Sequence, residues 1–224
     1  MCGRYTNNAE LEDIEKEFRV NLTESKSKPS YNVAPAQEIN AVLNQDSKTI
    51  LTELKWGLVP SWAKDPGIGN RMINARGETL AEKPSFREAF KKRRCIIPAT
   101  GFYEWKKGKD GKQPYYFFLP DKPIFGFAGL YEEWTDKETG ELLETCTIIT
   151  TEANDVLKPV HDRMPVILSS ENYSLWLDEK INDTDRLQKL IAPYSPKEMN
   201  AYPVSKSVNI PDVDSADLIK SISL

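Results

Sequence analysis

Histidine is almost missing from this chain of 224 residues, because His161 is its one histidine. A metal site built on several imidazoles is therefore excluded, and any catalytic histidine must be this residue. Cysteine is also scarce: Cys2, Cys95 and Cys146 are scattered singly, with no Cys-x-x-Cys pair. We therefore expect no disulfide framework and no zinc ribbon, and a reducing, cytoplasmic location.

Long apolar runs are absent as well. No stretch of about 18 apolar residues occurs, so we expect no transmembrane helix and no membrane partner. The first residues, Met-Cys-Gly-Arg-Tyr-Thr-Asn-Asn, lack the apolar segment of a signal peptide. No phosphate-binding glycine loop, metal-ligand cluster or dinucleotide fingerprint is found, so neither a metal nor a cofactor is expected.

Neither sign of charge dominates, because 30 Lys and Arg residues face 34 Asp and Glu residues. The net charge of −4 means that a polyanionic partner must meet a local basic surface. Hydrophobic residues make up 39% of the chain, which is enough for a substantial core. With no repeat and no low-complexity linker, we expect a single domain over residues 1–224 and a monomer.

Hydrophobic periodicity predicts helices and strands in separate parts of the chain. Asn7 or Asn8 is expected to cap the first helix and Ser85 the second. Helices are predicted at residues 7–20, 85–94, 154–160, 170–178 and 183–191. Strands are predicted at 38–43, 49–58, 94–97, 101–106, 113–119, 124–135 and 142–150, with an extended segment at 201–204 and a loop at 31–35.

Short connections join several of these strands. Asp110-Gly111 is a hairpin signal, and a turn is expected around Thr139-Gly140. Short hairpins imply antiparallel pairing, and segregated helices and strands favour the α+β class over a doubly wound sheet.

The second residue carries distinctive chemistry. Removal of Met1 would leave Cys2 with a free α-amine and a thiol on adjacent carbons. Such a 1,2-aminothiol can attack a carbonyl through sulfur, with the amine as base. Alternatively, the amine forms an imine with an aldehyde and the sulfur closes a five-membered thiazolidine, a step favoured by its intramolecular nature. From position alone, Cys2 could equally be a small residue at a tolerant terminus.

Six stretches of the sequence occur together in a characteristic order. They are Met1-Cys-Gly-Arg4, Tyr31-Asn-Val-Ala-Pro35, Trp56-Gly-Leu-Val-Pro-Ser-Trp62, Asn74-Ala-Arg-Gly-Glu78, Arg94-Cys-Ile-Ile-Pro-Ala-Thr-Gly-Phe-Tyr-Glu-Trp105 and His161-Asp-Arg-Met-Pro165. This ordered set, from residue 2 to about residue 168, resembles the SOS response-associated peptidase (SRAP) family, whose members crosslink covalently to abasic sites in DNA. The resemblance implies an α+β domain with mainly antiparallel strands curled into a barrel-like sheet with flanking helices. It leaves residues 169–224 as a packing segment.

The resemblance also implies a set of catalytic residues. Cys2 would form a thiazolidine with the aldehyde of an abasic sugar, and Asn74 would hold the N-terminal amine. Glu104 would support ring opening and imine chemistry, and His161 would transfer a proton to the sugar oxygen. From pattern alone, Asn74 would be a turn residue, Glu104 an exposed acid on a strand, and His161 a surface or satisfied core residue.

The resemblance also implies contacts to DNA. The expected partner is single-stranded DNA containing abasic sites, with junctions of single and double strands as a second form. Arg suits phosphate oxygens, and an exposed aromatic can stack on a base. Family positions that line the DNA match Arg4, Asn32, Pro35, Trp62, Arg76, Thr150 and Arg163. Thr151 is an alternative to Thr150. Some relatives carry two consecutive Trp where this chain has Trp62-Ala63, which weakens the expected stacking.

Further basic residues are expected to be mainly solvated surface. They are Lys91, Lys92, Arg93 and Arg94, and the hairpin lysines Lys106, Lys107, Lys109 and Lys112.

Three other functions fit parts of the sequence. A cysteine peptidase or autoprotease would use Cys2 as nucleophile and His161 as base. A class II glutamine amidotransferase also begins with Cys-Gly, but Arg4 and the later motifs argue against it. A non-covalent reader of single strands would use only the Arg and Trp contacts.

Overall fold

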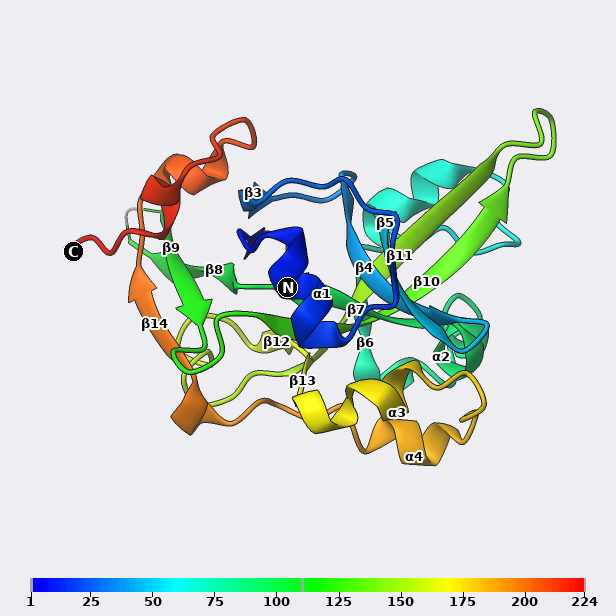
Figure 1. Cartoon of the computed structure of the whole chain (residues 1–224). Coiled ribbons are helices and arrows are strands. Elements are labelled where there is room, and N and C mark those ends of the chain that lie inside the picture. The colour runs from blue at the N-terminus through cyan, green and yellow to red at the C-terminus, as the bar shows by residue number, and fades with distance from the viewer. Residues whose placement is uncertain (1, 110, 224) are drawn as a thin grey trace.

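Five long strands close into a barrel. The computed structural model describes residues 2–109 and 111–223 (Figure 1). The barrel strands follow the order β5–β4–β7–β10–β11, and β11 then pairs with β5 to complete the ring. They are β4 (Glu38–Gln45), β5 (Lys48–Trp56), β7 (Arg94–Ala99), β10 (Phe125–Thr135) and β11 (Leu142–Glu152). The closing β11–β5 contact is parallel and the other four are antiparallel. The expected α+β class with a barrel-like sheet is confirmed.

A second, five-stranded antiparallel sheet lies beside the barrel. Its order is β14 (Asn200–Pro203), β9 (Gly111–Phe118), β8 (Gly101–Gly108), β1 (Tyr5–Asn7) and β3 (Ser30–Val33). Residues 31–35 were predicted as a loop, which is wrong for their first part. Tyr5 pairs with Val33 on one side and with Phe102 on the other, so β1 recruits this segment into the sheet. The sheet thereby brings the N-terminal residues next to β8.

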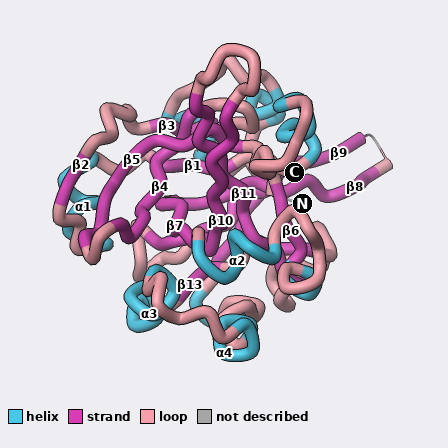
Figure 2. The backbone as a smooth tube through the Cα atoms, turned by 90° about the vertical axis from the view of Figure 1, so that its right-hand side faces the viewer, coloured by secondary structure: helices cyan, strands magenta, loops and turns pink. Residues whose placement is uncertain are grey.

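The hairpin of β8 and β9 projects away from the barrel (Figure 2). Gly108 pairs with Gly111 at its end, as the hairpin signal predicted. Gly111 has φ +101°, a left-handed conformation that favours glycine. Asp110 of that signal lies outside the described residues.

Short strands complete the barrel's margins. β2 (Leu22–Thr23) pairs with β5, and β6 (Asn74–Arg76) and β12 (Arg163–Pro165) pair with β11. β13 (Ile167–Leu168) pairs with β10. None of β2, β6, β12 and β13 was predicted, because two or three residues are too few for an alternating pattern.

Within residues 2–109 and 111–223, four α-helices are found near predicted positions, each shorter than expected. They are α1 (Leu11–Phe18), α2 (Arg87–Lys92), α3 (Tyr173–Leu177) and α4 (Thr184–Gln188). 3-10 helices cover Pro66–Arg71, Gly77–Thr79, Ser170–Asn172, Pro196–Glu198, Lys206–Asn209 and Ala216–Ile219. No helix among the described residues is long and apolar enough to cross a membrane.

Three local predictions were wrong. Residues 155–160 form turns rather than a helix, and the Asn154 side chain accepts hydrogen bonds from the backbone N–H groups of Val156 and Leu157. Asn7 belongs to β1 and Asn8 accepts from Thr100, so neither caps α1, whose N-cap is Glu10. Ser85 does not cap α2, which begins after Phe86.

Two buried clusters lie on opposite sides of the barrel sheet. One contains Ile14, Phe18 and Phe90 and packs α1, α2 and α3 against the strands. The other includes Cys2, Tyr5 and Trp56, so residue 2 is part of the core. Apolar burial of this kind is the main favourable contribution to folding, and here it also fixes the position of residue 2.

Candidate functional site

Cys2 is completely buried. It precedes β1, which lies between β3 and β8, and its exposed fraction is 0%. Burial raises the pKa of the Cys2 thiol, and the nearby Glu104 carboxylate raises it further. In this environment the thiol stays protonated at neutral pH, so its reaction as a nucleophile requires a neighbouring base.

Asn74 reaches the same residue from another strand. It begins β6, which pairs with β11 through the Asn74–Ile148 register. Its Nδ2 donates a hydrogen bond of 2.7 Å to the backbone carbonyl oxygen of Cys2. Its Oδ1 is buried and has no hydrogen-bond partner among the described residues. Asn74 is therefore a strand residue that holds the backbone of Cys2, and the turn interpretation is wrong.

Glu104 lies within β8, where it faces Tyr115 across the hairpin. Its exposed fraction is 2%, so the interpretation as an exposed acid is also wrong. The carboxyl lines a cavity of about 830 Å³ together with His161. Glu104 also raises the pKa of the Cys2 thiol, so it is the lining residue that links this cavity electrostatically to the buried Cys2.

His161 follows the turns at residues 155–160 and is half-buried. The backbone N–H of Arg163 donates to its Nδ1 at 2.9 Å, whereas an Asp162 carboxylate oxygen lies 3.0 Å from the same atom. The two contacts favour opposite protonation states of Nδ1. The Asp162 side chain is 88% exposed and interacts weakly through solvent, so the backbone contact decides the tautomer. We assign the proton of neutral His161 to Nε2, which makes Nε2 a proton donor.

Arg4 is held by a buried amide. Its guanidinium donates to the Asn32 Oδ1 at 2.7 Å and to the Val208 carbonyl at 2.9 Å. The Asn32 Nδ2 in turn donates to the carbonyls of Ile210 and Val213. Burial lowers the pKa of Arg4, although the group remains a cation. Asn32 was expected to line DNA, but it is buried and instead fixes Arg4 and the C-terminal segment.

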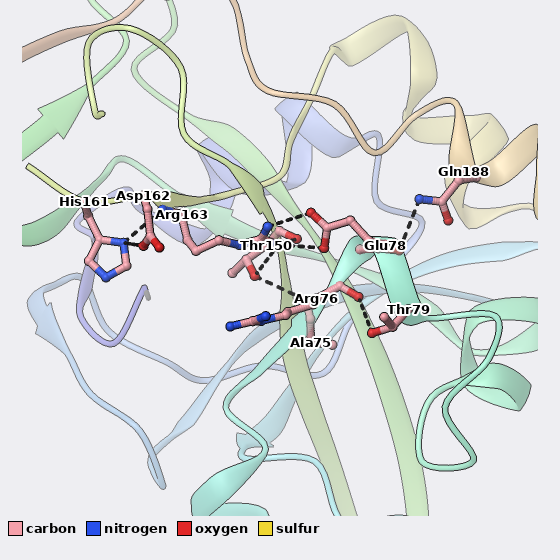
Figure 3. Close-up of polar contacts among 10 residues, drawn as sticks. Ala75, Arg76, Glu78, Thr79, Thr150, His161, Asp162, Arg163 and Gln188 are labelled. Carbon is pink, nitrogen blue, oxygen red and sulfur yellow. Dashed lines mark hydrogen bonds and ion pairs between the residues drawn. The ribbon is translucent and has the colours of Figure 1, made fainter. Parts of the chain in front are cut away.

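A second arginine centre is built on β6, β11 and β12 (Figure 3). Thr150 lies between Arg76 of β6 and Pro165 of β12 in the sheet register. Arg163 donates to both carboxylate oxygens of Glu78, at 2.6 and 3.0 Å, and to the Thr150 carbonyl at 2.7 Å. Its side chain is only 14% exposed, whereas Arg76 is exposed. The hydrogen bonds from Arg163 lower the pKa of Glu78.

Trp62 is presented by a firmly anchored loop, and its exposed fraction is 55%. On one side, the Val59 N–H donates to Thr145. On the other, the Trp134 indole N–H donates to the Ala63 carbonyl at 2.8 Å. The indole of Trp62 is therefore exposed without being loosely held. Pro35 is half-buried between β3 and β4.

The sequence interpretation gave no role to two residues that touch this site. Glu78 stands in the quoted Asn74–Glu78 motif, but nothing in the sequence indicated that it engages Arg163. Lys158 lines the cavity of Glu104 and His161, and it belongs to no motif. In the described part of the chain, no group of three or more His, Cys, Asp and Glu side chains is placed to hold a metal ion.

The fold and the site together define an α+β barrel protein with a cysteine-centred site next to its N-terminus and arginines around it. The model of the family "SOS response associated peptidase (SRAP)" matches residues 1–211. The chain belongs to this family.

Several named proteins are similar to it. The abasic site processing protein YoqW of Bacillus subtilis (strain 168) is 50% identical over 224 residues, covering 99% of this chain and 100% of that protein. The abasic site processing protein HMCES of Xenopus tropicalis is 32% identical over 214 residues, covering 82% of this chain and 63% of that protein. A crystal structure of a Bacteroides thetaiotaomicron protein shares the fold, with a TM-score of 0.91, 29% identity, and coverage of 99% and 100% of the two chains.

Proposed function

We propose that this protein acts on abasic sites in single-stranded DNA and crosslinks to them through Cys2 after Met1 is removed. The observation that carries the proposal is the 2.7 Å hydrogen bond from Asn74 to the Cys2 carbonyl, beside the buried Glu104. It fixes the backbone of the one residue whose amine and thiol can react together. Relatives named abasic site processing proteins, matched over nearly the whole chain, support the same substrate.

The reaction joins an aldehyde to an aminothiol. The Cys2 amine attacks C1′ of the ring-opened sugar, and the resulting carbinolamine loses water to give an imine. The Cys2 sulfur then adds to the imine carbon, while the imine nitrogen gains the proton that the thiol loses. The product is a thiazolidine, and one water molecule is released overall. Because both nucleophiles belong to one residue, ring closure is intramolecular and benefits from a high effective concentration.

Neighbouring side chains supply proton transfer and orientation. His161 donates a proton from Nε2 to the sugar ring oxygen as the ring opens. Glu104 accepts the thiol proton, which the burial of Cys2 would otherwise retain at neutral pH, and passes it to the imine nitrogen as the ring closes. The buried Asn74 Oδ1 accepts a hydrogen bond from the freed α-amine and directs its lone pair. Ring closure also removes the imine that would promote β-elimination, so the DNA strand stays intact.

DNA is held at the margin of this centre. Arg76 is exposed and contacts phosphate directly, and Arg4 contributes the positive charge that Asn32 holds in place. Trp62 stacks on a neighbouring base, with Pro35 as an apolar support. Arg163 completes the contacts on the β11 side, where the carbonyl of the buried Thr150 accepts one of its hydrogen bonds. We expect a monomer that acts in the cytoplasm, where the damaged strand is found.

The family description also names a peptidase. We propose that any proteolysis by Cys2 and His161 is confined to the removal of the chain's own first residue. Incubation of the purified protein with unrelated peptides is then expected to yield no cleavage.

The test uses a single-stranded oligonucleotide in which one uracil has been excised. The protein is mixed with this DNA and run on a denaturing gel, with Cys2→Ala and undamaged DNA as controls. We expect a heat-stable shifted band for the unaltered protein alone. Cys2→Ser retains the amine, so we expect an adduct only after borohydride reduction, together with strand cleavage.

Other results would contradict the proposal. A complex that survives only on a native gel would indicate the non-covalent reader. Peptide turnover without a shifted band would indicate the hydrolase. Mass spectrometry showing Met1 retained in the reactive protein would also exclude the thiazolidine.

A further inference from the structure

The cavity of Glu104 and His161 continues beyond them onto a lysine-rich surface. Its lining includes Lys106, Lys107 and Lys112 of the β8–β9 hairpin, and Lys158 from the turns before His161. These side chains come from two segments that are distant in sequence. We call this surface the lysine groove.

The positive charge of the lysine groove is poorly neutralised by the protein itself. Lys107 lies directly opposite Lys112 in the hairpin register, and like charges at such positions destabilise a strand pair. None of the ion pairs between residues of the described ranges includes the four lysines. Glu104 and Asp162 are the acidic residues of the lining, so cations exceed anions there. A surface of this kind is typical of an anion-binding site.

One wall of the lysine groove is held in place. The Trp105 indole N–H donates to the Asn209 Oδ1 at 2.8 Å, which fastens the hairpin to the 3-10 helix Lys206–Asn209. Both residues line the cavity. The half-buried Trp105 indole forms a fixed, partly apolar surface beside the lysines, against which a sugar or a nucleobase can pack.

The position of the lysine groove relative to the arginines indicates which part of the DNA it binds. The Arg163 guanidinium extends toward Glu78 and away from the His161 imidazole (Figure 3). His161 itself lines the lysine groove. A lesion inside a strand has nucleotides on both sides, and the proposed function assigns Arg76 and Arg163 to one of them. The nucleotides on the other side leave the reaction centre next to the lysines.

We propose that the lysine groove binds the phosphodiester backbone of the nucleotides on one side of the abasic site, so that DNA is held on both flanks of the reacting sugar. This inference rests on the proposed function, since it takes Glu104 and His161 as the reaction centre. It assigns phosphate contacts to Lys106, Lys107, Lys112 and Lys158, and it makes the hairpin a substrate-binding element.

The first experiment measures non-covalent affinity over a range of salt concentrations. The ligand is single-stranded DNA carrying a tetrahydrofuran, a stable abasic analogue, and the variant is Lys107→Gln/Lys112→Gln. On single-stranded DNA, each lost phosphate contact makes the negative slope of log K against log salt shallower by about 0.7. We therefore expect the slope of this variant to be shallower by about 1.4. Lys180→Gln/Lys189→Gln is the matched control, because these exposed lysines belong to the α3–α4 region and the change in net charge is equal.

The second experiment assigns the flank. Three ligands carry the analogue near the 5′ end, near the 3′ end, or in the middle. The hairpin variant should bind the central lesion more weakly. It should also bind just one of the two end lesions more weakly, namely the one that keeps the nucleotides bound by the lysine groove. Lys158→Gln, in a separate segment, should weaken the same two ligands, so the result does not depend on the fold of one hairpin variant. A slope equal to that of the control, or equal losses on both end lesions, would overturn the proposal.

The crosslinking gel separates this inference from the proposed function. At saturating DNA, the lysine variants should still form the covalent band. If the unaltered protein forms no band, the proposed function fails. If it forms the band and the salt slopes are unchanged, only the lysine groove is refuted.

Discussion

The proposed reaction centre and its surroundings are built in opposite ways. Cys2 and Glu104 are buried, and Asn74 of β6 holds the backbone of Cys2, which precedes β1, through a hydrogen bond. Arg76, Trp62 and the hairpin lysines are exposed. Bond formation demands reacting atoms at fixed positions, whereas phosphate binding demands cations that can release water and counterions. Changes at the centre should therefore alter the rate of crosslinking, and changes around it should alter affinity.

The largest effect is expected for Glu104→Gln. The amide cannot take the thiol proton, so the single-turnover rate of crosslinking should fall on the order of 10²- to 10³-fold while DNA affinity is kept. Quantified denaturing gels measure the rate, and fluorescence anisotropy measures the affinity. Glu141→Gln, an exposed change in the β10–β11 turn, is the control. A variant that reacts as fast as the unaltered protein would remove Glu104 from the mechanism.

Asn74→Ala should give the next largest effect. Without the 2.7 Å hydrogen bond the Cys2 backbone can shift. A shift of about 1 Å in the position of a reacting group lowers the rate about 10²-fold. The free energy of unfolding should fall by only about 1 kcal/mol, the net value of one hydrogen bond. The same gels and a thermal unfolding curve check both values. Unfolding of the variant at room temperature would contradict this division between rate and stability.

Trp62→Ala should lower affinity and leave the rate at saturating DNA unchanged. Stacking of one base on an aromatic side chain is worth about 1–3 kcal/mol, and this indole is held in an anchored loop. Trp62→Phe preserves a stacking surface and should recover part of the loss. If Trp62→Ala slows the saturated reaction instead, the comparison between centre and surroundings fails at this residue.

The smallest effect is expected for Glu78→Gln, which releases the Arg163 guanidinium for phosphate. Affinity for the tetrahydrofuran ligand should rise a few-fold, since an ion pair whose carboxylate is half exposed is worth on the order of 1 kcal/mol. Glu82→Gln, an exposed change nearby in sequence, should have no effect. Reduced affinity of Glu78→Gln would show that Glu78 orients Arg163 for DNA rather than competing with it.

The same ion pair has a defined pH dependence. Because Arg163 lowers the pKa of Glu78 in the folded chain, the pair stabilises the fold above the ordinary pKa of a glutamate. That stabilisation is lost as pH falls through the lowered value. The stability difference between the unaltered protein and Glu78→Gln should therefore vanish in acid, which unfolding curves at several pH values will show.

Much of the barrel could be predicted because its strands are long. The segments around β5, β10 and β11 alternate or run apolar over eight or more residues, so local pattern was sufficient. β1, β6 and β12 are three residues each, and they form strands only because β8 and β11 offer paired edges. The closing β11–β5 contact joins Cys146 to Trp56, far apart in sequence, and no local signal encodes it.

The candidate site, like the barrel, was only partly predictable from the sequence. Cys2, Asn74, Glu104 and His161 were found through motifs, but the pattern interpretation left Asn74 in a turn and Glu104 in solvent. The role of Asn32 depends on Arg4 and on carbonyls near the C-terminus, about 180 residues away. Such contacts depend on how distant segments pack, and periodicity does not contain that information.

The amino-acid order alone determined which reactive groups this protein has: one cysteine next to the start of the chain, one imidazole, and arginines interspersed among them. Only the tertiary structure decided that Cys2 is buried, that the Asn74 amide of β6 donates a hydrogen bond to its backbone carbonyl, and that lysines line the cavity of Glu104 and His161. The reason is physical. Chemical identity belongs to a residue wherever it lies, whereas proximity, desolvation and orientation arise only when remote strands pack against one another.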